Sequence, residues 1–113
     1  MMNPPIILYE LGCDVMAFRT IEDATGYIEP QDYNEYLAYD STGNLLHLRL
    51  KGEYVFLEAA ETDNAHRQEL ERVLVWFLTV ISQRKKYSGI TADWVIHASL
   101  EELIEKTIGL TGG

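Results

Sequence analysis

Residues 73–81, VLVWFLTVI, carry one polar side chain, that of Thr79, in a chain of 113 residues with a formal net charge of −9. Such an apolar run fits a buried strand or a helix, and its flank favours the helix, because residues 65–72 (AHRQELER) are a polar run of mostly good helix formers. Apolar residues recur at helical spacing from residue 70 and also cover much of the remaining circumference. The pattern predicts a long helix over residues 64–84 that is covered on more than one side.

One side of this helix is expected to lie on a sheet, and the other side needs a second cover. Residues 99–110, SLEELIEKTIGL, predict a C-terminal helix with a capping box of Ser99 and Glu102 and a C-cap at Gly109. Its apolar stripe consists of Leu100, Leu103, Ile104, Thr107 and Ile108. Packing of this helix on the long one would bury the second side. Otherwise a second copy of the chain would cover it, and the protein would be a homodimer.

The remaining segments read mainly as strands. Residues 6–11 predict a first strand, which residues 15–18 either continue or pair with. Residues 20–30 predict a short helix capped by Thr20 and ended by Pro30. Residues 35–58 predict a three-stranded meander with turns at DSTGN and KGE. Residues 94–96 fit either a strand or a helix. We therefore predict one α+β domain over residues 1–113, with a four- or five-stranded, mainly antiparallel sheet and the long and C-terminal helices on one face.

Cysteine content and hydropathy indicate a compartment. Cys13 is the only cysteine, so no intrachain disulfide can form and a reducing cytoplasm is the simplest location. Cys13 is expected to be a small buried apolar residue. The N-terminus has no basic region followed by a long apolar core, and no apolar run approaches the roughly 20 residues that span a bilayer. We expect a cytoplasmic protein without membrane contact.

The negative charge is concentrated in the first part of the sequence. Residues 1–63 contain twelve Asp or Glu and three Lys or Arg, whereas residues 64–113 contain six of each. Between Arg19 and Arg49 there is no Lys or Arg, but six acids lie there: Glu22, Asp23, Glu29, Asp32, Glu35 and Asp40. Such a field repels nucleic acid and anionic membranes and attracts a basic protein surface. The simpler interpretation is that the charge only keeps the protein soluble.

The sequence predicts no catalytic residue, metal site or cofactor. His47, His66 and His97 are not at ligand spacing with one another or with Cys13. No serine lies in a nucleophile-elbow motif, and no glycine-rich phosphate loop is present. We therefore expect a protein that is not an enzyme.

Tyrosines and acids alternate in residues 26–40, GYIEPQDYNEYLAYD. Tyrosine anchors interfaces through a large, stiff ring with a hydroxyl, and neighbouring acids steer a basic partner towards it. The candidate partner-binding residues are Tyr27, Glu29, Asp32, Tyr33, Glu35, Tyr36, Tyr39 and Asp40. Tyr33 is the candidate that we expect to be most exposed. Alternatively, the tyrosines only pack one face of the sheet while the acids face water.

The stretch TIEDATGYIEPQDYNEYLAYDSTGNLLHLRL, residues 20–50, resembles small bacterial immunity proteins of polymorphic toxin and contact-dependent inhibition systems. The similar features are a short helix, YIEP, a strand ending in YD, a Gly-Asn turn and an alternating strand. The closing SLEELIEKTIGL is similar in style. The resemblance implies a cytoplasmic, non-enzymatic inhibitor that covers a cognate toxin, often a basic nuclease. It transfers no site residue, because toxin-facing positions vary within these families.

Three functional hypotheses follow. The first is an acidic protein that neutralises a basic protein partner, namely an immunity protein. The second is a homodimeric accessory module that uses the apolar helix 64–84 as its interface. The third is a small-molecule-binding domain with a pocket between sheet and long helix, lined by Trp76, Trp94 and tyrosines.

Overall fold

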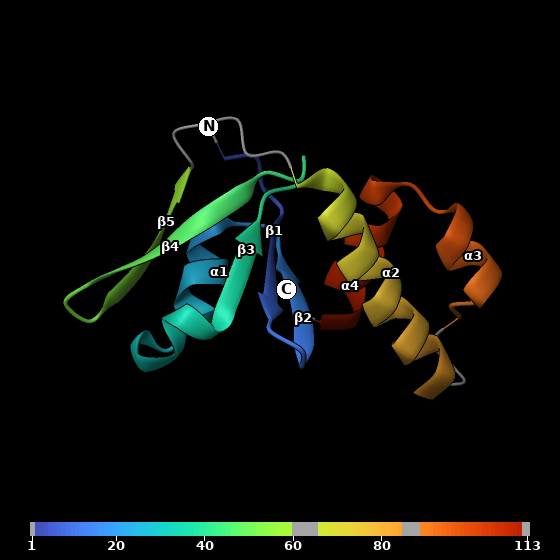
Figure 1. Cartoon of the computed structure of the whole chain (residues 1–113), viewed down its shortest axis with the longest axis horizontal. Helices are drawn as coiled ribbons and strands as arrows, with labels where there is room; N and C mark the ends of the chain where they lie inside the picture. Colours follow the sequence, from blue (N-terminus) through green and yellow to red (C-terminus); the bar gives the residue numbers. More distant parts are fainter. Residues whose placement is uncertain (1, 60–65, 85–88, 112–113) are drawn as a thin grey trace.

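The computed structural model describes residues 2–59, 66–84 and 89–111 of the chain. They form a five-stranded antiparallel sheet with helices on both faces (Figure 1). The strands are β1 (Ile6–Glu10), β2 (Asp14–Phe18), β3 (Tyr36–Tyr39), β4 (Leu45–Lys51) and β5 (Tyr54–Ala59), and the helices are α1 (Ile21–Tyr27), the 3₁₀ helix η1 (Pro30–Glu35), α2 (Arg67–Arg84), α3 (Ala92–His97) and α4 (Leu100–Thr111). The α+β architecture predicted from the sequence is confirmed.

The strand order is β2-β1-β3-β4-β5, so that β1 lies between β2 and β3 although it comes first in the chain. Residues 15–18 therefore pair back on the first strand, with Ile7 opposite Ala17 on one side and Tyr39 on the other. A buried central strand has both faces covered, which explains why β1 is a continuous apolar run rather than an alternating one. The helices α1 and η1 connect β2 to β3.

One face of the sheet carries the larger core. Side chains of Ile7, Val15 and Tyr39 meet the buried faces of α2 and α4 and the short helix α3. The predicted stripe of α4 is confirmed, because Leu100, Leu103, Ile104, Thr107 and Ile108 are all buried. The cover of the long helix is therefore internal: α2 and α4 lie side by side on the sheet, and α3 packs against α2 on the side away from the sheet (Figure 1). Burial of the second side of α2 requires no second copy, although Trp76 on its outer side remains 41% exposed.

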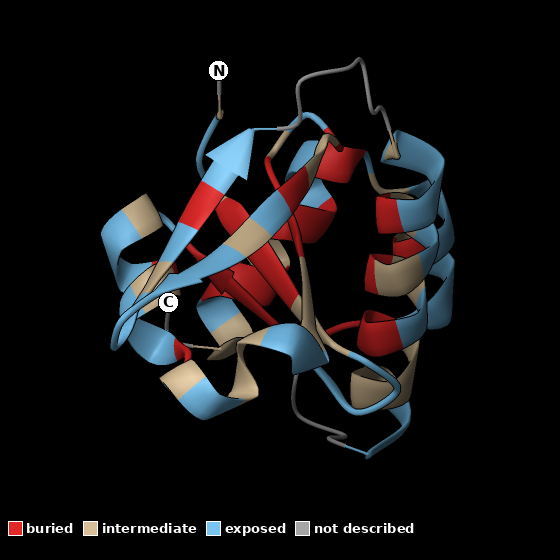
Figure 2. Ribbon diagram, turned by 60° about the vertical axis from the view of Figure 1, so that its left-hand side comes forward, coloured by how far each residue is buried: buried red, intermediate tan, exposed pale blue. Residues whose placement is uncertain are grey.

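The opposite face of the sheet holds a second core beneath α1 and η1. Ile6, Leu8 and Ala38 point to this face and pack with Ala24 and Ile28, which follow the predicted apolar side of the first helix. In β4, burial falls along the strand: Leu46 is 5% exposed, Leu48 is intermediate and Leu50 is 40% exposed. Figure 2 shows the result, with buried residues in the middle of the sheet and much of the β4–β5 hairpin exposed or intermediate.

Several local predictions are corrected by the structure. Cys13 is exposed in the turn between β1 and β2, because this turn extends beyond both cores. Gly109 lies inside α4, which continues to Thr111, and Pro30 begins η1 instead of ending α1. Residues 94–96 are helical, in α3.

The predicted capping box of α4 is confirmed, because hydrogen bonds form in both directions, from Ser99 N to Glu102 and from Glu102 N to Ser99. No described helix is long and apolar enough to cross a membrane.

Candidate partner-binding surface

Six of the eight candidate residues reach the surface, and we call this set the α1–η1 surface: Tyr27, Glu29, Asp32, Tyr33, Glu35 and Tyr36. Tyr39 and Asp40 are fully buried, so their assignment to a partner-binding surface is wrong. The six surface residues come from the end of α1, from η1 and from the first residue of β3. They therefore lie on the side of the sheet opposite α2 and α4.

Local capping and a short 3₁₀ turn position these residues. α1 begins at Ile21 because Thr20 Oγ1 accepts from Asp23 N at 3.1 Å. The chain then turns through Glu29, whose carboxylate accepts from the amide of Gln31 at 2.7 Å. At the far end of η1, Leu11 N donates to Glu35 O at 3.1 Å and ties it to the β1–β2 turn. The far end of the acidic segment is thereby fixed to the β1–β2 turn.

The tyrosines of the surface differ in exposure. Tyr27 is 50% exposed and lies over Phe18, with ring centroids 5.3 Å apart. Tyr33 and Tyr36 are half-buried against the second core. The expectation that Tyr33 is the most exposed tyrosine of this segment is wrong, because its ring packs beside the sheet. Tyr27 is therefore the accessible aromatic anchor, and alternation along β3 turns Tyr36 outward relative to Tyr39.

Tyr36 connects the surface to Glu10, an acid outside the set predicted from the sequence. Its hydroxyl donates to Glu10 Oε2 at 3.3 Å. Burial raises the pKa of Tyr36 to about 12, and the negative charges of Glu10 and Asp32 contribute. The hydroxyl thus stays a neutral donor at physiological pH. Glu10 could have been found only from strand register, because β1 and β3 place it directly opposite Tyr36.

The acids of this region have no ion-pair partner within the described part of the chain. Among the acids of residues 2–59, only Glu58 is in an ion pair with another described residue. Its partner is Arg49, at 3.4 Å. Arg19, the cation nearest in sequence to α1, pairs with Glu105 of α4 at 3.0 Å instead. Within the described part of the chain, none of the acids of α1 and η1 is in an ion pair: Glu22, Asp23, Glu29, Asp32 and Glu35. Their combined field is open to an external cation.

Tyr39 is buried because β3 is a central strand and its side chain points to the face covered by α2. Burial raises its pKa, and the nearby Glu69 carboxylate raises it further. Even so, the geometry leaves the Tyr39 hydroxyl without a hydrogen-bond partner among the described residues. A desolvated hydroxyl without a partner is a cost to the fold.

Replacement of Tyr39 by Phe is therefore expected to leave the free energy of unfolding unchanged or to raise it by up to about 1 kcal/mol. Tyr36→Phe is the matched control, because that hydroxyl does donate a hydrogen bond, and we expect a loss of about 1 kcal/mol. Urea denaturation of both variants measures the difference. A larger loss for Tyr39→Phe than for Tyr36→Phe would show that the Tyr39 hydroxyl has a stabilising partner.

Asp40 is buried because two segments, the N-terminal one and the β3–β4 turn, converge on its carboxylate. Oδ1 accepts from Thr42 N, Thr42 Oγ1 and Asn44 N at 3.0, 2.7 and 3.0 Å. Oδ2 accepts from Asn3 N and Asn44 Nδ2, both at 3.3 Å. Asp40 therefore holds the β3–β4 turn and the N-terminal segment, and it is a structural residue rather than a binding one.

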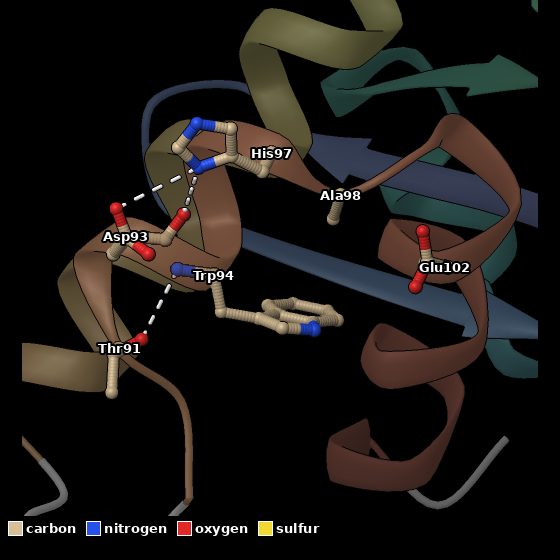
Figure 3. Close-up of a pocket in the computed structure, with 6 residues that line it drawn as sticks. All are labelled: Thr91, Asp93, Trp94, His97, Ala98 and Glu102. Atoms are coloured by element: carbon tan, nitrogen blue, oxygen red, sulfur yellow. Dashed lines mark hydrogen bonds and ion pairs between the residues drawn. The ribbon is translucent and has the colours of Figure 1, made fainter.

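A shallow groove lies between α3 and α4 around Trp94. Figure 3 shows one part of it, a hollow of about 330 Å³ lined by Thr91, Asp93, Trp94, His97, Ala98 and Glu102. A second part of about 460 Å³ lies on the α4 side of Trp94, where Lys106 Nζ is 5.4 Å from the ring. Trp76 is not part of this groove and instead packs edge-on against Tyr9, at 6.2 Å between centroids. Among the described residues, Trp76 and Trp94 thus do not line a common groove.

The described residues contain no group of three or more His, Cys, Asp or Glu side chains placed to hold a metal ion. His97 Nδ1 lies 2.8 Å from the carbonyl of Asp93, and His66 Nδ1 lies 2.8 Å from Glu69 Oε2, both within one helical turn. Such contacts at the ends of helices are typical of local structure.

No protein-family model matches the chain, and no curated protein or solved structure is significantly similar to it.

Proposed function

We propose that this protein is a non-enzymatic inhibitor that captures a basic protein partner on its α1–η1 surface. The observation that carries the proposal is that the acids of α1 and η1 are not ion-paired within the described chain. Acids that only served solubility could lie anywhere on the surface. Here Asp32 and Glu10 are close enough to Tyr36 to raise its pKa, so both act on a common region.

In the proposed binding mode the acids and the tyrosines have different roles. Glu29, Asp32 and Glu35 attract the partner and orient it before contact, which mainly raises the association rate. Tyr27 is half exposed and backed by Phe18, so it can bury its ring in the complex with little loss of side-chain freedom. The hydroxyl of Tyr36, held by Glu10, adds a fixed polar group.

The resemblance of residues 20–50 to immunity proteins suggests the identity of the partner. We propose a toxin domain of the nuclease type, whose cationic substrate-binding surface this acidic region would cover. Inhibition would then be competitive with nucleic acid and would require no chemistry from this chain. On this proposal the protein acts in the cytoplasm, where such a toxin is active.

The test uses a toxin domain of the nuclease type, to be sought in the gene immediately upstream, and two double variants of equal charge. The first is Asp32→Lys with Glu35→Lys on the proposed surface. The control is Glu53→Lys with Glu101→Lys, on the β4–β5 turn and α4. Each pair contains one acid in the first turn of a helix. Each replacement changes the charge by +2, so both variants carry −5 instead of −9.

We expect the surface variant to associate at least about tenfold more slowly at low salt and to show a weaker salt dependence, while the control stays close to wild type. Surface plasmon resonance at several salt concentrations measures the rates, and a nuclease assay measures inhibition. Equal slowing of association by both variants would show that only the net charge matters and not the position of the acids. Wild-type inhibition by the surface variant would contradict the proposed surface.

A further inference from the structure

The two edges of the sheet are treated differently by the rest of the chain. At the β2 edge, Val15 N donates to Asp14 Oδ1 at 2.9 Å, and Ala17 N donates to Thr111 Oγ1 of α4 at 3.3 Å. These backbone donors are therefore occupied by the protein's own side chains. An edge closed in this way cannot readily pair with another strand.

The β5 edge has no comparable protection among the described residues. A two-residue turn, Gly52 and Glu53, joins β4 to β5, so Lys51 and Tyr54 form a hydrogen-bonded pair. Pairs alternate along an antiparallel ladder, and the backbone groups of Val55, Leu57 and Ala59 therefore point away from β4. No described residue makes a loop or side-chain hydrogen bond to them.

The side chains of β5 also lack the features that discourage edge pairing. The strand, YVFLEA, contains no Pro or Lys, and Glu58 carries its only charge. Tyr54 is 79% exposed and Phe56 is 38% exposed. Val55 and Leu57 pack towards α1 and η1, so Tyr54 and Phe56 point to the same face of the sheet as α2, but they are not part of the core beneath α2. Open backbone groups and exposed aromatic rings thus occur on the same edge.

We propose that β5 pairs with β5 of a second copy of this chain, antiparallel, around a two-fold axis at Phe56. In this register Val55 of one copy lies opposite Leu57 of the other, so the outward backbone groups of both strands bond to each other. Phe56 meets Phe56 at a non-hydrogen-bonded pair, where side chains approach most closely. Tyr54 faces Glu58 of the other copy.

The positions of the charges along β5 favour this register. Glu58 is separated from Glu58 of the other copy because each faces a tyrosine, and no like charges are directly opposed. The Arg49–Glu58 ion pair on the same face remains intact, because it lies between β4 and β5 of one copy. A register shifted by two residues would place Leu57 on the axis. Phe56 of each copy would then lie opposite Glu58 of the other copy, and the pair of aromatic rings would be lost.

Sedimentation velocity over a range of concentrations tests the proposal with the full chain. The wild type is expected to form a dimer in a concentration-dependent manner. Phe56→Lys and Phe56→Glu each place like charges across the axis and remove the aromatic pair, so each alone should raise the dissociation constant at least about tenfold. Mixed together, the two variants should form a one-to-one heterodimer, because the ammonium introduced in one copy then faces the carboxylate introduced in the other.

Ile96→Lys is the matched control, because Ile96 is 72% exposed and belongs to α3, which lies far from β5 in the fold (Figure 1). It should dimerise like the wild type, and circular dichroism should show that all variants are folded. A monomeric wild type at all concentrations would overturn the proposal. A dimer that survives both Phe56 variants would place the interface elsewhere, and a mixture that stays monomeric would exclude the Phe56-centred register.

Discussion

Asp40→Ala is expected to lower the free energy of unfolding by about 3 kcal/mol or more. The carboxylate is fully buried and accepts hydrogen bonds from Asn3, Thr42 and Asn44. Removing it leaves these donors desolvated without an acceptor, which costs more than the loss of one exposed interaction. Guanidinium denaturation measures the change. Glu35→Ala is the control, because this exposed acid lies in the same segment and its loss should change stability by less than about 0.5 kcal/mol.

The same site predicts a pH dependence. Burial alone would raise the pKa of Asp40, but the hydrogen bonds from Thr42, Asn44 and Asn3 outweigh it and lower the pKa below its ordinary value of 3.8. The folded protein therefore holds Asp40 ionised at pH values where the unfolded chain protonates it. This contribution to stability is complete above the ordinary value and is lost as the pH falls through the lowered pKa. The stability difference between wild type and Asp40→Asn should accordingly shrink below about pH 4. A difference that stays constant down to about pH 2 would contradict this.

Gly43→Ala is expected to destabilise the protein by about 2–5 kcal/mol. Gly43 has a φ of 91°, which L residues rarely adopt, and a Cβ there would lie 2.5 Å from the Cα of Arg67. Gly43 O also accepts from His66 N at 2.7 Å, so the turn and the start of α2 are in direct contact. Any relief of the clash must move the helix that covers the larger core.

Gly109→Ala is the matched control for this prediction. Gly109 lies inside α4, and a Cβ there would meet nothing within 4 Å. Alanine at this helical position should stabilise the protein by about 0.5–1 kcal/mol. Thermal unfolding of the two variants should therefore shift in opposite directions. If Gly43→Ala unfolded like the wild type, the close approach of the β3–β4 turn to α2 would not exist in solution.

Asp40 and Tyr39 show why part of the candidate site could not be predicted from the sequence. The sequence places Asp40 on the surface because it ends a run of alternating tyrosines and acids. Its burial depends on Asn3, which lies 37 positions away, and on the turn that brings Thr42 and Asn44 back to it. The burial of Tyr39 has a related cause. Alternation predicts that Tyr36 and Tyr39 point to opposite faces of the sheet, but it does not say which face α2 covers. Neither fact is encoded within the segment itself.

Other predictions succeeded because their physical cause is local. The i, i+3, i+4 stripe of residues 99–110 must face the core wherever the helix lies, and the Ser99–Glu102 capping box forms within four residues. Residues 73–81 carry apolar side chains around most of the helix and therefore required cover on more than one side, which the sheet, α3 and α4 provide. The alternation of β4 predicted one face for Leu46, Leu48 and Leu50, but not how burial falls towards the exposed hairpin turn.

By itself the sequence determined the α+β class, most of the elements and the excess of negative charge in the first part, because these depend on short-range periodicity, capping and composition. Only the tertiary structure decided which members of the tyrosine and acid segment reach solvent, which cations pair with which acids, and that β2 is a closed edge while no described residue closes the β5 edge. These properties arise from contacts between residues far apart in the chain. Arg19, for instance, is drawn to Glu105 of α4 rather than to the acids next to it in sequence, and this leaves the α1–η1 surface negatively charged.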